Sequence, residues 1–277
     1  QGVSSAASDV YKRQVLGIRE DDLVYQGFSV AFDMSFEEIW ISYLVGATLW
    51  LAPAELVGDP EALARTWDEQ GITVIHAVPT LMGLIEAPLP RVRLINLGGE
   101  ACPDALVGRL ARPGRALFNT YGPTETSVTA TMTALTPGQP VTIGHPLPNY
   151  GVLVVDADHR LVPAGEVGEL AIFGPGLAAG YLGRPDLTAA KFVPNPHARD
   201  ESEALMYLSG DLARLEPDGP IHCLGRVDDQ VKIRGFRVEL GEIETHLGNE
   251  PGVAAAAVVL RPIAGVDQIV GFVVPSP

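Results

Sequence analysis

The feature that most constrains the fold is a regular alternation of helix signals and short β-branched apolar runs in the first half of the chain. Asp59 and Pro60 place an N-cap residue and a first-turn proline ahead of a helix that Gly71 ends. The apolar runs at 72–77 and 93–97 read as buried strands on either side of a second helix. Strands and helices that alternate at this spacing predict parallel βαβ units.

A helix is also predicted immediately after the strand signal at 22–29. Ser35 has the character of an N-cap, and Glu38 stands three residues later, which is the pattern of a capping box. This helix is expected to run to about Gly46.

From about residue 141 the helix signals give way to short runs punctuated by glycine and proline, which predicts an antiparallel β-rich subdomain. Past residue 228 a strand, a helix and another apolar strand predict the beginning of an α+β subdomain. The expected fold is therefore α/β in class. A non-native-looking tail (1–14) precedes a βαβ-layered part (15–140), which is followed by a small β-rich barrel-like subdomain (141–227) and the start of a mobile C-terminal α+β subdomain (228–277).

Both ends of the chain look cut. Residues 1–14 have no helical or strand periodicity and resemble an artefactual tail, so they are set aside from the fold prediction. Residues 268–274 read as a buried strand, and a strand beside one short helix cannot bury its own apolar face. More chain is therefore expected downstream.

Charge and cysteine content exclude several classes of partner. Lysine and arginine total 19 against 34 acidic residues, a net charge of -15, which argues against nucleic acid and anionic membrane surfaces as partners. Cys102 and Cys223 match no metal or disulfide spacing, which favours a reducing, cytoplasmic setting. The longest apolar stretch, 39–53, is interrupted and falls short of the roughly 20 residues of a membrane span.

The segment 119–125 has the composition of a loop that approaches a polar ligand. Gly122 permits close backbone approach, Thr124 offers a hydroxyl to a phosphate, and Glu125 offers a hard carboxylate to Mg²⁺. A Gly-Pro turn before a helix start explains the same residues equally well. Further along, Asp211 can accept the two hydroxyls of a ribose or cap a turn, and Arg226 can bind a ligand or join a surface ion pair.

Taken together, five segments in this order resemble the adenylation domains of nonribosomal peptide synthetases, which belong to the adenylate-forming superfamily. The segments are 32–35, 119–125, 168–170 with 180–182, 207–211 and 225–239. The resemblance implies a large N-terminal adenylation subdomain followed by a mobile C-terminal one. It implies that ATP and Mg²⁺ are used, with Glu125 as the metal ligand and Thr124, Glu125 and Arg226 as the catalytic set.

By the same resemblance, Tyr121 packs on the adenine, Asn119 hydrogen-bonds its exocyclic amine, and Asp211 holds the ribose. The full set implied in nucleotide binding is Gly98, Gly99, Glu100, Asn119, Tyr121, Gly122, Thr124, Asp211 and Arg226. Asp228 corresponds to the hinge of the C-terminal subdomain, and Gly235 to the loop that faces a phosphopantetheine thiol.

The resemblance also implies an amino-acid substrate, because Asp33 corresponds to the residue that pairs with the α-ammonium group. The implied substrate-binding set is Asp33, Met34, Glu37, His76, Ile95, Leu97, Thr120, Val128 and Thr129. Two carboxylates in one small pocket repel unless the ligand brings a second positive charge, so Glu37 favours a diamino acid. The alternative is a first-turn acid that points to water. His76 binds substrate or is a satisfied core histidine. The chain also resembles adenylation domains of the poly-ε-lysine synthetase type.

The implied reaction forms aminoacyl-AMP with release of pyrophosphate and then transfers the aminoacyl group to the phosphopantetheine thiol of a peptidyl carrier domain. The family's phosphate loop is expected before Val15 and its lysine after Pro277, so the 277 residues alone are expected to be inactive. Two alternatives stay open: an acyl- or aryl-CoA ligase with the same nucleotide chemistry, and a nucleotide- or carrier-binding module without catalysis.

Overall fold

The computed structural model describes residues 12, 14–56, 58–217, 219–228, 230–233, 235–263 and 266–276. It consists of two compact units, the first extending to Gly225 and the second beginning at Arg226. This boundary lies two residues before Asp228, where the sequence predicts a hinge.

The first unit is built on a seven-stranded sheet with the order β2-β1-β3-β4-β5-β6-β7. The first five strands in that order are parallel, and β6 and β7 extend the sheet in antiparallel fashion. The parallel βαβ prediction is thereby confirmed. The strands are β1 (Leu23–Gln26), β2 (Thr48–Leu51), β3 (Val74–Ala77), β4 (Leu94–Gly98), β5 (Ala116–Tyr121), β6 (Thr131–Ala134) and β7 (His145–Pro146).

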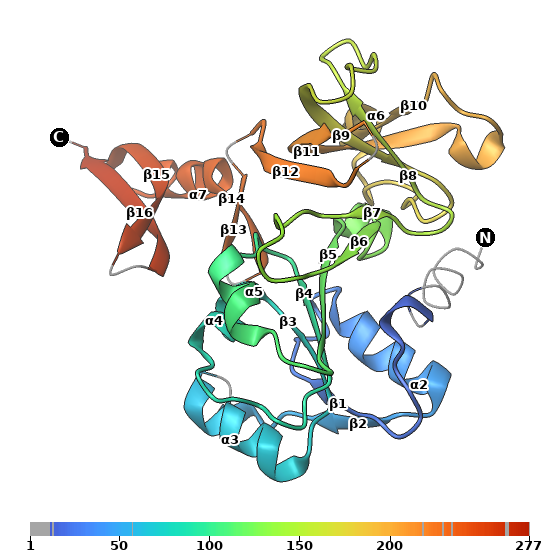
Figure 1. Cartoon of the computed structure of the whole chain (residues 1–277). Coiled ribbons are helices and arrows are strands. Elements are labelled where there is room, and N and C mark those ends of the chain that lie inside the picture. Colours follow the sequence, from blue (N-terminus) through green and yellow to red (C-terminus); the bar gives the residue numbers. More distant parts are fainter. Residues whose placement is uncertain are drawn as a thin grey trace. The chain divides into compact units, whose positions relative to one another are not determined.

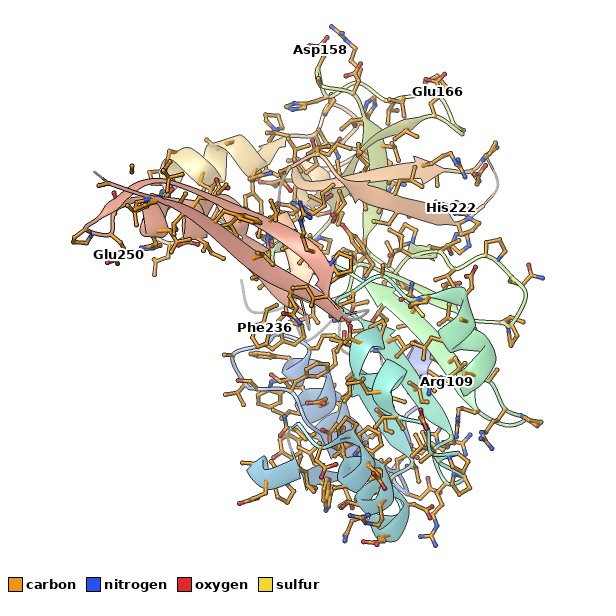
Figure 2. All side chains as sticks on the ribbon, turned by 90° about the vertical axis from the view of Figure 1, so that its left-hand side faces the viewer. Arg109, Asp158, Glu166, His222, Phe236 and Glu250 are labelled. Carbon is orange, nitrogen blue, oxygen red and sulfur yellow. The ribbon has the colours of Figure 1, made fainter. Side chains whose placement is uncertain are left out.

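Three helices cover one face of this sheet, and a short helical segment lies on the other (Figure 1). As predicted, α3 begins after Asp59, whose Oδ1 accepts from Ala62 N at 3.0 Å, and it ends at Gly71. Arg109 of α5, labelled in Figure 2, donates to the carbonyls of Met82 and Gly83 at the end of α4. The helices are η1 (Glu37–Ile41), α2 (Ser42–Val45), η2 (Ala54–Leu56), α3 (Pro60–Gln70), α4 (Pro79–Leu84), α5 (Asp104–Leu110) and η3 (Thr124–Thr126).

Strand alternation separates the two faces of the sheet. Ile95 and Leu97 of β4 belong to the apolar core with α3, α4 and α5, together with the fully buried Trp67. Asn96 lies between them and therefore points to the opposite face, where its side chain contacts Glu37 of η1.

The capping box predicted around Ser35 is wrong. The helix begins as the π-helix η1, its N-cap residue Phe36 makes no side-chain cap bond, and Ser35 Oγ has no hydrogen-bond partner among the described residues. The Glu38 carboxyl turns away from the helix end and accepts instead from the backbone nitrogen of Gly27. The predicted end of the helix is confirmed, since Gly46 adopts φ +76° and caps α2.

The chain then forms an antiparallel sheet, β10-β11-β9-β8, with β12 paired to β11, in agreement with the predicted β-rich part. The pairing of β9 with β11 shifts register between Leu208 and Leu212, which marks a bulge at the segment that carries Asp211. The elements are β8 (Gly151–Val155), β9 (Val167–Phe173), α6 (Pro185–Lys191), β10 (Phe192–Pro194), η4 (Glu201–Glu203), β11 (Leu205–Leu215) and β12 (Ile221–Arg226).

The second unit is α+β, as predicted. It contains the hairpin β13 (Gln230–Ile233) and β14 (Phe236–Glu239), the helix α7 (Leu240–Gly248), and the hairpin β15 (Val253–Ile263) and β16 (Val266–Pro275). Glu244 of α7 accepts from the backbone nitrogen of Val258 at 2.7 Å, which ties the helix to β15. The expectation of a buried strand at 268–274 is wrong, because Phe272, Val273 and Val274 are each more than half exposed.

In the part of the chain that the structure describes, no helix has both the length and the apolar character that a membrane crossing needs.

Candidate active site

A hydrogen bond joins the segment before η1 to the segment that opens η3. Thr124 Oγ1 donates to Asp33 Oδ2 at 2.5 Å, although 91 residues separate the two in sequence. Burial raises the pKa of Asp33, the nearby Glu37 carboxylate raises it further, and the bond from Thr124 opposes both. The structure thus brings the residue predicted to bind an α-ammonium group to the residue predicted to bind a phosphate.

Glu125, next to Thr124, is held from two sides. Its Oε1 accepts from the Tyr181 hydroxyl at 2.6 Å, and its backbone carbonyl accepts from Ala178 N at 2.8 Å. Both partners come from the 174–182 segment, which the sequence resemblance singled out only through its Gly-Tyr-Leu end. Burial, followed by the bond to Glu125, raises the pKa of Tyr181.

The donor set around Glu125 fits Mg²⁺ better than a metal ion that is coordinated by protein side chains alone. Among the described residues no group of three His, Cys, Asp or Glu side chains is placed to hold a metal ion. Mg²⁺ is usually held by one or two carboxylates together with substrate phosphates and water, so one buried carboxylate beside a threonine predicted to bind a phosphate is a suitable set.

Tyr121 and Asp211 form a buried pair between the two sheets of the first unit. Tyr121, the last residue of β5, donates its hydroxyl to Asp211 Oδ2 at 2.5 Å. The bulge in β11 positions Asp211, where Gly210 adopts φ +77° and donates its backbone N–H to Glu169 at 2.8 Å. Burial and the adjacent Asp211 raise the pKa of Tyr121 well above its ordinary value.

Packing within its own loop requires a glycine at position 122. A Cβ atom at this position would lie 2.5 Å from the carbonyl oxygen of Val128 and 2.7 Å from Ala130 N. Glycine is therefore required because the returning backbone of the same loop passes against it. The predicted approach of a ligand to Gly122 stays a prediction.

Glu37 is the centre of a buried polar cluster on the η1 side of the sheet. Its side chain is 1% exposed, and its Oε1 accepts from Thr129 Oγ1 at 2.6 Å and lies 3.0 Å from Lys12 Nζ. Its Oε2 accepts from Asn96 Nδ2 at 3.3 Å and lies 3.8 Å from His76 Nδ1. The alternative of a first-turn acid pointing to water is therefore wrong.

The charge on Glu37 is balanced by these neighbours. Burial by itself would raise the pKa of Glu37, but the Lys12 ammonium and the hydrogen bond from Thr129 oppose burial, and the pKa lies below its ordinary value. A buried carboxylate kept ionised in this way needs a cation beside it. In this structure the cation is the Lys12 ammonium, which also donates to the Ser127 carbonyl at 3.1 Å.

His76 is neutral, and its tautomer follows from its neighbour. Asn96 Nδ2 can only donate, and it lies 3.2 Å from His76 Nδ1, so Nδ1 is the acceptor and the proton is on Nε2. Burial lowers the pKa of His76, with the nearby Glu37 carboxylate opposing that effect. His76 Nε2 and Asn96 Oδ1 have no hydrogen-bond partner among the described residues, which leaves one donor and one acceptor available in the cluster.

The backbone above Glu37 is strained. Val128 adopts φ +74°, and Thr129 N donates to Ser127 O at 2.9 Å, which together define a γ-turn of the rare left-handed kind. A β-branched residue is strongly disfavoured at this φ. The turn directs the Ser127 carbonyl to Lys12 and the Thr129 hydroxyl to Glu37.

Other predicted residues are placed as follows. Gly98 lies against Met34 and Thr120, since an added Cβ would be 3.1 Å and 2.7 Å from their side chains. Asn119 Nδ2 donates to Thr142 O at 2.7 Å. Gly99 adopts φ +80° beside Phe32, and Glu100 accepts from Thr80 N at the start of α4.

Ile95 and Leu97 are not brought together with this group. They lie in the core under α3–α5, on the face of the sheet opposite to Glu37, because adjacent residues of a strand point to opposite sides. The same alternation places Asn96 in the cluster. This alternation of side chains along a strand is a sequence signal that could have identified Asn96. No comparable signal marked Lys12, which lies in the segment set aside as a tail.

Arg226, Asp228 and Gly235 belong to the second unit. Arg226 Nε donates to Asp228 Oδ1 at 2.6 Å, so the predicted nucleotide-binding and hinge residues form an ion pair with each other. Gly235 adopts φ +82° in the turn between β13 and β14. The roles predicted for these three residues stay predictions.

Comparison with known proteins assigns the family. The model of the family described as AMP-binding enzyme matches residues 2–182. The chain belongs to this family. It is 61% identical over 265 residues to Delta-poly-L-ornithine synthetase of Acinetobacter baumannii (strain AB307-0294) and 46% identical over 279 residues to Novobiocin biosynthesis protein H of Streptomyces niveus.

Solved structures agree with the fold prediction. The Vibrio cholerae adenylation domain AlmE in complex with glycyl-adenosine-5'-phosphate matches 98% of this chain with a TM-score of 0.87 and 27% identity. NpsA-ThdA, an artificially fused adenylation-PCP di-domain from Klebsiella oxytoca, matches 95% with a TM-score of 0.80 and 28% identity.

The chain spans only part of these proteins. The alignment with Delta-poly-L-ornithine synthetase includes 96% of this chain but only 20% of that relative. The alignment with Novobiocin biosynthesis protein H includes 98% of this chain and 45% of that relative. The chain covers 53% and 50% of the two structures.

Proposed function

We propose that this chain is part of an amino-acid adenylating ligase of the nonribosomal peptide synthetase type. The activity is ATP-dependent formation of aminoacyl-AMP with release of pyrophosphate, followed by transfer of the aminoacyl group to the phosphopantetheine thiol of a carrier domain. The observation that supports this proposal is the bond between Thr124 and Asp33, because it joins the hydroxyl predicted to bind a phosphate to the carboxylate predicted to bind an α-ammonium group. A cytoplasmic setting, in which ATP is available, is part of the proposal.

The residues divide the work of the first step. Asp33 holds the α-ammonium group, and the single hydroxyl proton of Thr124, which Asp33 accepts in this structure, is donated to the α-phosphate when substrates are bound. Bringing two anions together requires orientation and positive charge rather than covalent help from the protein. Mg²⁺, held at Glu125, supplies that charge when bound. Tyr121 and Asp211 form the nucleoside end of the site, with Asp211 binding the ribose hydroxyls.

We infer further that the amino acid is a diamino acid whose distal ammonium group binds Glu37. Glu37 is buried and ionised, and a primary ammonium already lies 3.0 Å from its Oε1. That ammonium belongs to Lys12, so the geometry of the cluster suits an alkylammonium group. The name of the 61% identical relative, an L-ornithine polymer synthetase, supports the same substrate class.

The experiment is amino-acid-dependent pyrophosphate exchange by the full-length protein, with ornithine, lysine, diaminobutyrate, leucine and phenylalanine as substrates. A diamino acid is expected to be preferred, and Glu37→Gln is expected to lower kcat/KM for it on the order of 100-fold, because loss of a buried charge pair costs several kcal/mol. Glu61→Gln, an exposed acid in the first turn of α3, is the matched control and should be unchanged.

Preference for leucine or phenylalanine over every diamino acid would overturn the substrate assignment, as would an unchanged preference in Glu37→Gln. Absence of exchange with any amino acid would overturn the activation proposal itself. An acyl- or aryl-CoA ligase is disfavoured by Asp33, since such an enzyme has no α-ammonium group to bind; use of free coenzyme A as the acceptor is the test that separates the two.

A further inference from the structure

Two adjacent glutamates in η1 are both buried but serve different neighbours. Glu37 is 1% exposed and faces the polar cluster described above, whereas Glu38 is 0% exposed and takes no part in it. η1 is a π-helix, a rare conformation that occurs often at functional sites. The fully buried Glu38 has no role in the proposed reaction, and its contacts therefore call for a separate explanation.

The contacts of Glu38 all lead to the end of β1. Its Oε1 accepts from Gly27 N at 3.1 Å, and its Oε2 accepts from Phe28 N at 3.3 Å and from Gln26 Nε2 at 3.0 Å. Gln26 Nε2 also donates to the Phe28 carbonyl at 2.6 Å. A single carboxyl group thus fixes the three residues at which the chain leaves the sheet.

That point is where the loop carrying Asp33 begins. The loop runs through 27–36 and is folded on itself, since Phe32 N donates to Ser29 O at 2.8 Å and Phe36 N to Asp33 O at 3.0 Å. The rings of Phe28 and Phe32 lie 5.0 Å apart, so the start of the loop packs against the residue before Asp33. The loop ends in η1, the helix that carries Glu38 itself.

Glu38 therefore links the two ends of the loop. The Asp33 carboxylate meets Thr124, which is on a distant segment, and this requires the loop to be held in place at both ends. We propose that Glu38 is a positioning residue that holds Asp33 in the orientation needed to bind the substrate α-ammonium group. This inference rests on the proposed amino-acid activation.

A positioning role and a merely structural one predict different kinetics. If Glu38 acts through Asp33, its loss weakens only the contact with the α-ammonium group. An analogue of the substrate that lacks the α-amino group cannot use that contact and should be unaffected. If Glu38 serves only the stability of the fold, the substrate and the analogue should be affected equally.

The experiment measures pyrophosphate exchange by the full-length protein with ornithine and with 5-aminopentanoate, which is ornithine without its α-amino group. The wild type is expected to favour ornithine strongly. In Glu38→Gln, one acceptor oxygen becomes an NH₂ group that faces a backbone N–H donor. We expect KM for ornithine to rise at least tenfold, with KM for ATP and the constants for 5-aminopentanoate within twofold of wild type.

Two further variants keep the test interpretable. Gln26→Met removes one of the three donors to Glu38 and leaves both backbone donors, so a smaller loss of ornithine preference in the same direction is expected; it carries the test if Glu38→Gln fails to fold. Glu203→Gln is the matched control, because Glu203 is a buried glutamate that accepts from Arg199 N at 3.0 Å in another loop. It should leave the preference unchanged.

The positioning role would be overturned if both Glu38→Gln and Gln26→Met lost the same exchange activity with ornithine as with 5-aminopentanoate. It would also be overturned if neither variant lost exchange activity with either substrate. Both outcomes would leave the activation proposal intact. If the wild type exchanges no pyrophosphate with any amino acid, the activation proposal and this inference fall together. In combination with Asp33→Asn, Glu38→Gln should add no further loss for ornithine, because the contact it serves is already gone.

Discussion

The hydroxyl of Thr124 donates to the carboxylate of Asp33 at 2.5 Å, and this bond connects two segments that are 91 residues apart. Asp33 lies in the loop after β1, and Thr124 opens η3 after β5. Since β1 and β5 are parallel strands of one sheet, their carboxyl ends lie at the same edge, which is where ligands bind in open α/β sheets.

Removing that hydroxyl should impair amino-acid activation. Thr124→Val keeps the shape of the side chain but removes its single hydroxyl proton, which Asp33 accepts in this structure and which the α-phosphate is proposed to accept when ATP is bound. We expect kcat/KM in pyrophosphate exchange to fall on the order of 10- to 100-fold, equivalent to about 1.4–2.8 kcal/mol. Thr124→Ser retains the hydroxyl and should stay within a few-fold of wild type. Equal activity of the valine and serine variants would contradict this role.

Removing the Tyr181 hydroxyl should weaken the metal site. Tyr181→Phe takes away the donor that holds Glu125 Oε1 at 2.6 Å, so that the carboxylate is less well oriented. The Mg²⁺ concentration for half-maximal exchange should rise roughly 10-fold or more, and the affinity for Mn²⁺ in the presence of ATP, measured by calorimetry, should fall in parallel.

The control for that prediction is Tyr207→Phe, whose hydroxyl lies 3.4 Å from that of Tyr181 and leaves the bond to Glu125 in place. It should not change the Mg²⁺ requirement. A shift of the same size in both variants would mean that general packing of the aromatic cluster, rather than the bond to Glu125, sets the requirement.

The strain at Val128 predicts an unusual order of stabilities. At φ +74° a residue with a Cβ is strained by roughly 1–3 kcal/mol, and glycine is not. Val128→Gly should therefore be more stable than Val128→Ala in urea unfolding, the reverse of the order usual in extended or helical backbone. Both variants should lose activity several-fold, because the Ser127 carbonyl and the Thr129 hydroxyl become less well fixed. An alanine variant more stable than the glycine variant would contradict the γ-turn.

Glu38 should make stability depend on pH. Burial raises its pKa from 4.5 to about 8, even though three N–H donors oppose the shift. A group whose pKa is raised on folding contributes stability that is complete below its unfolded pKa and is lost as the pH rises through its folded pKa. The free energy of unfolding should therefore fall between pH 4.5 and 8 by up to about 1.4 kcal/mol per pH unit and level off above.

The measurement is urea unfolding at pH 6, 7, 8 and 9 for wild type and Glu38→Gln. The glutamine variant cannot titrate at this position, so the difference in stability between the two proteins should shrink as the pH rises. A difference that stays constant would show that Glu38 is ionised at all these pH values, and a difference that grows with pH would also contradict the raised pKa.

Local signals in the sequence were sufficient for most elements. The start and end of α3 follow from Asp59, Pro60 and Gly71, whose effects act within one helical turn. The helix end at Gly46 is equally local. The start of that helix is not local, because Glu38 bonds to residues 26–28 across a loop instead of to its own helix end, and a capping-box pattern contains no information about such a partner.

The same distinction holds for the site. Asp33, Thr124 and Glu125 could be selected from the sequence because they stand in segments that resemble a known family. Ile95 and Leu97 were selected in place of Asn96, because the direction of a side chain in a strand depends on which face of the sheet meets which helix. Lys12 was not predicted to belong to the site, and Tyr181 stood in the 180–182 segment without a predicted role, since their partners Glu37 and Glu125 are 25 and 56 residues away.

The sequence by itself determined the order of helices and strands, the parallel sheet and the family, because caps, turns, apolar periodicity and motifs are properties of neighbouring residues. Only the tertiary structure decided which charges are buried together. Packing of the sheet against η1 brings other groups within about 3 Å of Glu37 and Glu38. These groups decide whether Glu37 faces water or a cation, and whether Glu38 caps a helix or holds a loop. Burial matters because an unpaired charge is strongly destabilising in a buried site.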